Sequence, residues 1–182
     1  MSEYRLITDC KRGKLSARRE LYNQYASRMM ALCIRYVGNE EDAKDVLQEG
    51  FIKVFTQIEQ FSGEGAFGGW IRKVFVNVAL EFLRSKKRKM EKEVLLDYSN
   101  DLSDAVDAID TLAVNDLLDC IAELPEAYRT VFNLFAIEGF SHREIATMLH
   151  IEESTSRSQF FRARRLLQEK VAILTTKSDA KQ

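Results

Sequence analysis

Residues 141–165 read SHREIATMLHIEESTSRSQFFRARR. Ser141 and Glu144 form the capping-box pattern S-x-x-E, in which each of the two side chains satisfies a backbone N–H group at the start of a helix. The pattern therefore predicts a short helix directly after Ser141. The helical spacing of apolar residues places its buried side at Ile145, Met148 and Leu149.

A second helix is predicted after the turn at residues 150–153, with Ser154 as its N-cap. Apolar and small side chains occupy its inner positions, namely Phe160, Ala163 and Leu167. Mostly basic and polar side chains occupy its outer positions, namely Arg157, Ser158, Phe161, Arg162 and Arg165. A short capped helix, a tight turn and a second helix with basic outer positions is the helix-turn-helix arrangement, which fits the major groove of DNA.

The residues before this motif predict two more helices and a linker. Apolar spacing favours a helix over residues 112–124 and another after Pro125, which suits a first helical turn because its missing N–H would be unpaired there anyway. Gly139 is a natural stop for that second helix. Residues 93–111 are rich in Asp and Ser with weak periodicity, so we expect a linker that is at most partly helical.

The N-terminal half predicts three longer helices. The first covers residues 15–37 and ends at Gly38, and Asn39 is the expected N-cap of the second. Apolar residues of the second helix follow an almost unbroken i, i+3, i+4, i+7 pattern: Ala43, Val46, Leu47, Gly50, Phe51, Val54, Phe55 and Ile58. After a glycine-rich loop the third begins at Phe67 and ends in the cationic run of residues 84–89.

These patterns predict an all-α protein of two small helical domains joined by an acidic linker. A single proline and only eight glycines leave long stretches free of residues that interrupt helices. We expect the first domain over residues 1–92 and the linker over 93–111. The second domain is expected over 112–175 and a tail over 176–182.

The formal net charge of −1 conceals a basic segment, an acidic segment and a second basic segment. Residues 1–92 carry a net charge of +6, residues 93–126 carry −10 with no Lys or Arg, and residues 127–182 carry +3. Two basic segments around an acidic one suggest two domains that face a polyanion and a linker that avoids or imitates nucleic acid. An ordinary solvated linker between two slightly basic bundles is the alternative.

Cysteine and histidine usage argues against several other classes of protein. The three cysteines lie far apart and form no CxxC pair, which favours a reduced, cytoplasmic compartment. With only two histidines in the chain, we expect no metal site and no cofactor. No apolar run approaches the roughly 20 residues that a membrane span needs, so we expect no membrane insertion.

Over nearly its whole length the chain resembles the sigma-70 superfamily, and within it the small extracytoplasmic-function (group IV) sigma factors that keep only domains 2 and 4. The motifs that carry the resemblance occur in order: DAKDVLQEGF at 42–51, WIRK at 70–73, NVALEFLR at 77–84, LPEAYR at 124–129 and the helix-turn-helix at 141–165. The resemblance implies a promoter-recognition subunit of RNA polymerase and not an enzyme. Its implied partners are core RNA polymerase, promoter DNA and an anti-sigma factor, with no small-molecule substrate.

The resemblance also implies roles for residues of the N-terminal domain. Asp45, Gln48 and Glu49 would grip the coiled coil of the polymerase clamp; an ordinary solvated helix face is the alternative. The loop after Phe61 and the helix after it look like the element that opens the −10 region, where aromatic and polar groups capture exposed bases beside a cationic track. The residues so implied are Phe61, Ser62, Glu64, Phe67, Asn77, Arg84, Lys86, Lys87 and Arg88. A core position is the alternative for Phe67 and for Trp70.

In the second domain, six residues match positions that meet the −35 element in the family: Ser154, Arg157, Ser158, Phe161, Arg162 and Arg165. An arginine can bond two acceptors of one guanine, which makes Arg157 and Arg162 the candidates for base contacts. The sequence departs from the family at three places. His150 replaces a frequent turn glycine, Ser156 replaces an apolar residue, and Gln159 replaces an arginine.

Two other interpretations compete with this one. The pattern GxGxxG at residues 63–68 matches a dinucleotide-binding fingerprint, but that fingerprint requires a preceding strand, and the segment before it has a helical period. A helix-turn-helix repressor or response-regulator output domain would account for residues 112–175. It would leave unexplained the polar face near Asp45, the glycine loop and the cationic helix end.

Overall fold

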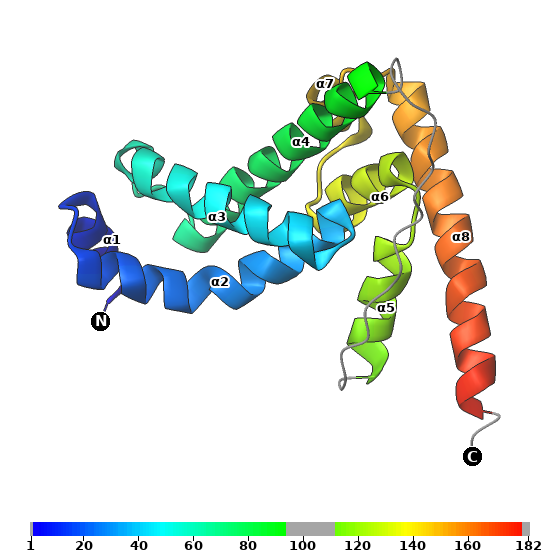
Figure 1. Ribbon diagram of the computed structural model, residues 1–182, viewed down its shortest axis with the longest axis horizontal. Coiled ribbons are helices and arrows are strands. Elements are labelled where there is room, and N and C mark those ends of the chain that lie inside the picture. Colours follow the sequence, from blue (N-terminus) through cyan, green and yellow to red (C-terminus); the bar gives the residue numbers. More distant parts are fainter. Residues whose placement is uncertain (1, 94–111, 180–182) are drawn as a thin grey trace. The chain divides into compact units, whose positions relative to one another are not determined.

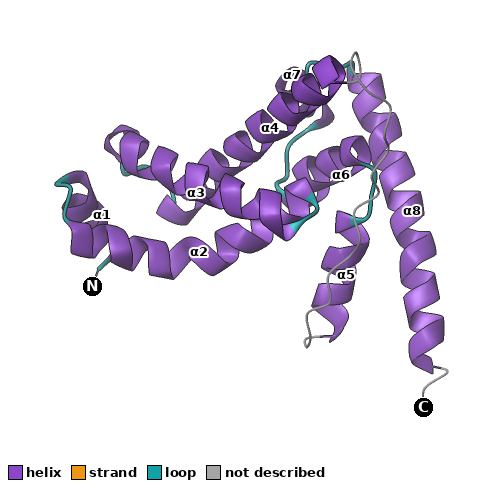
Figure 2. Cartoon of the chain, in the orientation of Figure 1, coloured by secondary structure: helices purple, strands orange, loops and turns teal. Residues whose placement is uncertain are grey.

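The computed structural model describes residues 2–93 and 112–179, and the side chains of residues 2–90 and 117–173. All secondary structure in these residues is helical, which confirms the all-α prediction (Figure 2). The chain divides into two compact units, Met1–Ser103 and Asp104–Gln182 (Figure 1). The linker predicted over residues 93–111 lies outside the described residues except for Glu93, which is the last residue of a helix.

The described part of the first unit is a helical bundle. Its helices are α1 (Glu3–Lys11), α2 (Leu15–Val37), α3 (Glu40–Gln57), the short 3₁₀ turn η1 (Ile58–Gln60) and α4 (Phe67–Glu93). Helices α2, α3 and α4 each pack against the other two, and α1 packs against α2 and η1. The sequence patterns had not predicted α1, which Ser2 caps and which buries Leu6 and Cys10.

The predicted C-terminal end of α2 and the predicted start of α3 are both confirmed. Gly38 adopts a left-handed conformation with φ of 87°, and its N–H donates to the carbonyl of Ile34 at 2.8 Å. The Asn39 side chain accepts a 2.8 Å hydrogen bond from the N–H of Asp42, and three acidic residues occupy the first turn of α3. The start of α3 is therefore fixed by its own sequence.

Close approach of α3 and α4 depends on the glycine at position 50. A Cβ atom at Gly50 would lie 2.2 Å from Cε1 of Phe75, a distance that no pair of non-bonded carbon atoms tolerates. The Phe75 ring is fully buried and also meets Phe51 edge-on at a centroid distance of 5.2 Å. The ring therefore occupies the space that a side chain at position 50 would need.

The described part of the second unit contains α5 (Leu112–Ala122), α6 (Glu126–Phe132), the π-helical turn η2 (Asn133–Ile137), α7 (His142–Leu149) and α8 (Glu153–Asp179). Its core includes Cys120, Ile121, Leu124, Ala163 and Leu167. The buried Arg129 guanidinium donates to the carbonyls of Ala122 and Leu124, at 2.5 and 3.1 Å. Because carbonyls at a helix end lack partners inside the helix, Arg129 completes the end of α5 and joins it to α6.

Several details of the second unit differ from the sequence prediction. Pro125 is the N-cap of α6 and not a residue of its first turn. Helix α8 begins at Glu153, so Ser154 lies inside the first turn instead of capping it, and the helix continues to Asp179 through most of the predicted tail. The chain before Gly139 forms the π-turn η2, in which the Glu138 N–H reaches back to the Asn133 carbonyl at 2.9 Å.

Replacing Gly50 with alanine should destabilise the first unit. Alanine gains about 1 kcal/mol of helix propensity over glycine, but forcing a methyl group into a packed core costs about 1–3 kcal/mol, and here the neighbour is a fully buried ring. The difference is a net loss of up to about 2 kcal/mol in the free energy of unfolding, and we expect the upper end of this range in urea denaturation because the ring cannot move aside. Gly69→Ala is the matched control, because a Cβ atom at Gly69 would meet no neighbouring atom within 4 Å. Equal stability of the two variants would contradict the packing argument.

Candidate nucleic-acid interface

The helix-turn-helix begins with the predicted capping box, which is confirmed. The Ser141 hydroxyl accepts a 3.3 Å hydrogen bond from the N–H of Glu144, and the Glu144 carboxylate accepts one of 2.8 Å from the N–H of Ser141. Hydrogen bonds from the hydroxyl and the N–H of Ser141 lower the pKa of Glu144. These two hydrogen bonds between Ser141 and Glu144 therefore fix the residue at which α7 begins.

The turn between α7 and α8 contains the one non-glycine residue with positive φ among the described residues. His150 has φ of 56° and ψ of 47°, the left-handed conformation that glycine adopts most easily. Its N–H donates to the carbonyl of Ala146, which closes α7. His150 thus adopts at this turn the left-handed conformation that would suit a glycine.

The N-terminal half of α8 gathers the predicted −35 residues on one exposed surface. Arg157, Ser158, Phe161, Arg162 and Arg165 are all exposed, and their spacing along the helix puts them on one side. Ser154 is also exposed, in the first turn of α8. The Phe161 ring is 67% exposed, which is unusual for so large an apolar group. We call these residues, Arg157, Ser158, Phe161, Arg162 and Arg165, the α8 outer face.

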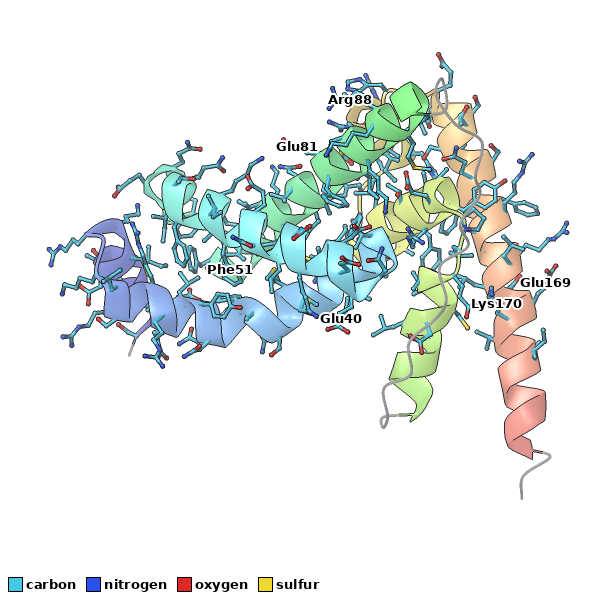
Figure 3. The ribbon with its side chains drawn as sticks, in the orientation of Figure 1. Glu40, Phe51, Glu81, Arg88, Glu169 and Lys170 are labelled. Carbon is cyan, nitrogen blue, oxygen red and sulfur yellow. The ribbon has the colours of Figure 1, made fainter. Side chains whose placement is uncertain are left out.

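Each arginine of the α8 outer face already has a neighbour. Arg157 pairs with Glu153 at 2.5 Å, and Arg165 pairs with Glu169 at 3.2 Å, each one helical turn away. Figure 3 labels Glu169 and Lys170 on this helix. Arg162 donates a 3.1 Å hydrogen bond to the Tyr128 hydroxyl of α6. Exposed ion pairs of this kind contribute little to stability, so a phosphate or a base can replace them at low cost.

A shallow groove of about 250 Å³ runs beside the α8 outer face. Its lining residues are Tyr128, Phe161, Arg162, Arg165 and Leu166. The groove therefore combines aromatic rings with two guanidinium groups, a composition that suits the sugar-phosphate chain and base edges of nucleic acid.

In the first unit, the predicted base-stacking aromatics are core residues. Phe67 is 1% exposed and Phe61 is 7% exposed. The Phe67 ring stacks on Trp70 at a centroid distance of 5.7 Å and meets Phe61 at 5.1 Å. Their faces are therefore occupied by one another and by the bundle. Ser62 and Glu64, in the loop between them, are exposed.

The loop is anchored at its start to the first helix. The Lys11 ammonium of α1 donates a 3.0 Å hydrogen bond to the Phe61 carbonyl, which is part-buried. The Ser62 hydroxyl accepts a 3.3 Å bond from the N–H of Glu64. The polar loop thus lies between Phe61 and Phe67, whose rings pack together, and Lys11 joins its start to α1.

Polar and basic residues of α4 form an exposed stripe. Asn77, Arg84 and Arg88 are exposed at intervals of seven and four residues, which places them on one side of the helix, and Lys87 is exposed beside them. Figure 3 labels Glu81 and Arg88 on this helix. Glu81 lies within the stripe and forms an ion pair with Lys53 of α3. The stripe is basic at the end that follows Arg84.

Lys86 differs from its neighbours because it faces α3. Its ammonium lies 2.5 Å from the Asp42 carboxylate and forms an ion pair between α4 and the first turn of α3. Partial burial raises the pKa of Asp42, but hydrogen bonds from Lys86 and Asn39 outweigh it and leave the pKa below its usual value. The structure therefore gives Lys86 an interhelical partner, whereas sequence reasoning counted it with the surface cations.

The predicted polymerase-binding residues share an exposed face of α3. Asp45, Gln48 and Glu49 are all exposed, with Val46 buried beneath them. Ile52, one turn further on, is 48% exposed. A groove of about 210 Å³ adjoins Glu49 and is lined by Val46, Glu49, Val78, Glu81, Phe82 and Ser85. The face is thus acidic and polar, with apolar surface at its edge.

Three interactions of these surfaces were not predicted. They are the pairs Lys86–Asp42 and Lys53–Glu81 between α3 and α4, and a contact of His142 with Ser156 between α7 and α8. All three join residues on different helices. The one available signal was Ser156 itself, a polar residue for which the resemblance had implied an apolar one.

The described residues offer neither a metal site nor a membrane span. No group of three or more His, Cys, Asp or Glu side chains among them could hold a metal ion. Within the same residues, no helix is long and apolar enough to cross a membrane.

Comparison with protein families defines the class of this chain. Residues 21–89, which cover most of α2, all of α3 and most of α4, match the model of Sigma-70 region 2. Residues 115–167, from α5 into α8, match the model of Sigma-70 region 4. The first helical unit therefore contains Sigma-70 region 2, and the second contains Sigma-70 region 4.

Individual relatives show which group of sigma-70 proteins the chain is similar to. The chain is 32% identical to the ECF RNA polymerase sigma-E factor of Haemophilus influenzae, over 96% of this chain and 97% of the relative. It is 30% identical to the ECF RNA polymerase sigma factor SigW of Bacillus subtilis, over 92% and 96% of the two chains. The chain belongs to the ECF RNA polymerase sigma factors, which are transcription factors, and it serves in transcription initiation.

A solved structure shares the fold. The sigma factor RpoE of Bartonella quintana, crystallised in complex with the anti-sigma factor NepR, matches with a TM-score of 0.57 and 18% identity. The match covers 85% of this chain and 96% of that one.

The Lys86–Asp42 pair makes a pH-dependent prediction. Lys86→Met should lower the free energy of unfolding at pH 7 by roughly 0.5–1 kcal/mol, a small value because both side chains are partly exposed. Since the folded pKa of Asp42 is depressed, this contribution is full above the unfolded pKa of about 4 and is lost as the pH falls through the folded pKa. Urea titrations at pH 7 and pH 3 measure the difference. Lys89→Met, on the exposed side of α4, is the control; a Lys86→Met effect that is no smaller at pH 3 than at pH 7 would exclude the ion pair as its source.

Proposed function

We propose that this sigma factor directs RNA polymerase to promoters by reading the −35 element with α8 and opening the −10 region with α4 and the loop before it. One observation carries the proposal: five exposed side chains, three of them arginines, lie on one side of α8, behind a capped α7 and a tight turn. This is the arrangement in which the second helix of a helix-turn-helix enters the major groove.

The α8 outer face supplies the groups that distinguish bases. Arg157 and Arg162 can each donate two hydrogen bonds to O6 and N7 of guanine, and the exposed Phe161 ring suits the methyl group of thymine. Ser158 and Ser154 add hydroxyls near the helix start, and Arg165 lies further along, where a phosphate is the expected partner. On binding, DNA replaces the Glu153 carboxylate and the Tyr128 hydroxyl as partners of Arg157 and Arg162.

The first unit supplies the groups that stabilise opened DNA. Ser62 and Glu64 lie between the packed residues Phe61 and Phe67, so the loop can hydrogen-bond an extruded base without rearranging its support. Asn77 lies on the exposed stripe of α4, and Arg84, Lys87 and Arg88 continue that stripe as a track for phosphates. Phe61 and Phe67 act in this proposal as the support of the loop. Lys86 contributes by holding α4 against α3.

The α3 face of Asp45, Gln48 and Glu49 is the proposed contact with core RNA polymerase. Acidic and amide groups at three exposed positions of one rigid helix suit a basic coiled-coil surface. We propose promoter DNA and core polymerase as partners, an anti-sigma factor as the regulator that competes for these surfaces, and the cytoplasm as the site of action. The RpoE structure with NepR is an example of such a regulator in a protein of the same fold.

Removing Arg157 should reduce −35 recognition specifically. One bidentate contact contributes about 1–3 kcal/mol of discrimination, so Arg157→Ala should lower the preference for an intact over a scrambled −35 element by about 5- to 150-fold. Run-off transcription from the two templates measures this preference. Affinity for core polymerase, measured by co-elution, should not change.

Arg28→Ala is the matched control, because Arg28 is an exposed arginine of α2 in the other unit. It should leave the −35 preference unaltered. Parallel loss of core binding in Arg157→Ala would show that the residue acts on polymerase and would overturn the assignment of α8.

Removing Asn77 should weaken strand opening. The loss of one or two hydrogen bonds to an exposed base corresponds to about 1–2 kcal/mol, so Asn77→Ala should reduce the fraction of open complex by roughly 5- to 30-fold. Permanganate reactivity of −10 thymines in the holoenzyme complex measures this fraction. Asn23→Ala, an exposed asparagine of α2, serves as the control. Normal reactivity in Asn77→Ala on every tested promoter would contradict the −10 assignment.

A further inference from the structure

His142, the first residue of α7, lies between the π-turn η2 and the first turns of α8. Its ring stacks on Phe135 of η2 with a centroid distance of 4.2 Å and an interplanar angle of 11°. Phe160 of α8 meets the same ring edge-on at 5.8 Å. The imidazole is thus packed as an aromatic side chain between two other rings, although it can also form hydrogen bonds.

The polar partner of His142 is buried in α8. Ser156 is 0% exposed, and its Oγ lies 2.9 Å from Nδ1 of His142, a hydrogen-bond distance in either direction. Apolar groups lie around this pair: Phe135 and Phe160 contact the His142 ring, and Ile145 of α7 is fully buried. A hydroxyl in such surroundings needs a partner, because an unpaired buried polar group is costly. His142 provides it.

The position of Ser156 connects this pair to the DNA-reading surface. Ser156 immediately precedes Arg157 and Ser158, the first two residues of the α8 outer face. Rotation of α8 about its axis would break the hydrogen bond to His142 and would carry Arg157 round with it. The His142–Ser156 pair therefore adds a directional constraint on Arg157 to the apolar packing of Ala163 and Leu167.

Charged groups next to the imidazole come from α8. Burial and the nearby Arg157 guanidinium lower the pKa of His142 below its ordinary value of 6.5, and Glu153 opposes them weakly. On the other side η2 presents the Phe135 ring. The imidazole is consequently neutral at pH 7, and a proton gained at lower pH would place a second positive charge beside Arg157.

We propose that His142 is a positioning residue for −35 recognition: through its hydrogen bond to Ser156 it sets the rotation of α8, and with it the base contacts of Arg157, without touching DNA. The inference rests on the proposed −35 function of α8. It assigns to a residue of the first helix of the motif part of the specificity that the second helix expresses. Ser156, the departure from the family's apolar residue, is then half of a matched pair.

Two variants test the pair. His142→Phe keeps the ring stack but leaves the Ser156 hydroxyl buried without its partner, and we expect the preference of holoenzyme for an intact over a scrambled −35 duplex to fall roughly tenfold. The double variant His142→Phe with Ser156→Ala lacks the hydrogen bond but leaves no unpaired hydroxyl, so it should regain stability while the −35 preference stays low. Fluorescence anisotropy of labelled duplexes with the holoenzyme measures it.

A pH profile separates positioning from a purely structural role. For the wild-type chain the −35 preference should be constant from about pH 8 to 6.5 and should fall at lower pH, as His142 takes up a proton. The double variant should show no such fall. The chain contains only two histidines, so His150→Asn, which tolerates the left-handed turn, is the control and should keep the wild-type profile.

Each outcome decides between the two proposals. Loss of the preference in both His142→Phe and the double variant supports the positioning role. Wild-type preference in His142→Phe, or recovery of the preference in the double variant, overturns it, provided that Arg157→Ala loses the preference. If Arg157→Ala keeps the preference, the −35 function of α8 itself fails. Should His142→Phe fail to fold by circular dichroism, the double variant and its pH profile decide the question alone.

Discussion

Helix α3 can lie against α4 as it does only because position 50 has no side chain. The fully buried Phe75 ring fills the space where a Cβ would stand, at a distance of 2.2 Å. The ion pairs Lys86–Asp42 and Lys53–Glu81 require the same approach of the two helices. The proposed polymerase face lies on α3 and the proposed −10 stripe lies on α4. One contact in the core therefore sets the spacing between two surfaces for which different partners are proposed.

Much of this architecture could be predicted from local sequence. The ends of α2 and α3 and the start of α7 follow from Gly38, Asn39 and the Ser141–Glu144 box, because a capping residue acts within its own helix. The longer helices could be predicted from the spacing of their apolar residues, which is likewise a local property of each helix. Helix α1 was missed: it has nine residues, and only part of it is buried. A short helix of this kind is stabilised mainly by the neighbour that covers it.

The sequence predicted which residues the candidate sites contain, but not which of their side chains are covered or paired. Sequence reasoning placed Phe61 and Phe67 among the base-stacking groups, yet each ring is covered by the other and by Trp70. It counted Lys86 with the surface cations, and it placed the cap of α8 at Ser154. These differences in exposure and pairing share a cause: which side of a residue is covered depends on chain segments distant in sequence. The exposure of Asn77 and of the α8 outer face needed only the helical period, so here pattern and structure agree.

The length of α8 adds a mechanical property to the second unit. At 27 residues the helix is about 40 Å long, whereas the outer face occupies only its N-terminal half. Lys170, in the second half, forms an ion pair with Glu123 just beyond the end of α5. A tilt of a rigid helix of this length by about 5° about one end moves the other end by about 3 Å, on the scale of a hydrogen bond. A partner that binds the C-terminal end of α8 would therefore also displace the proposed −35 surface.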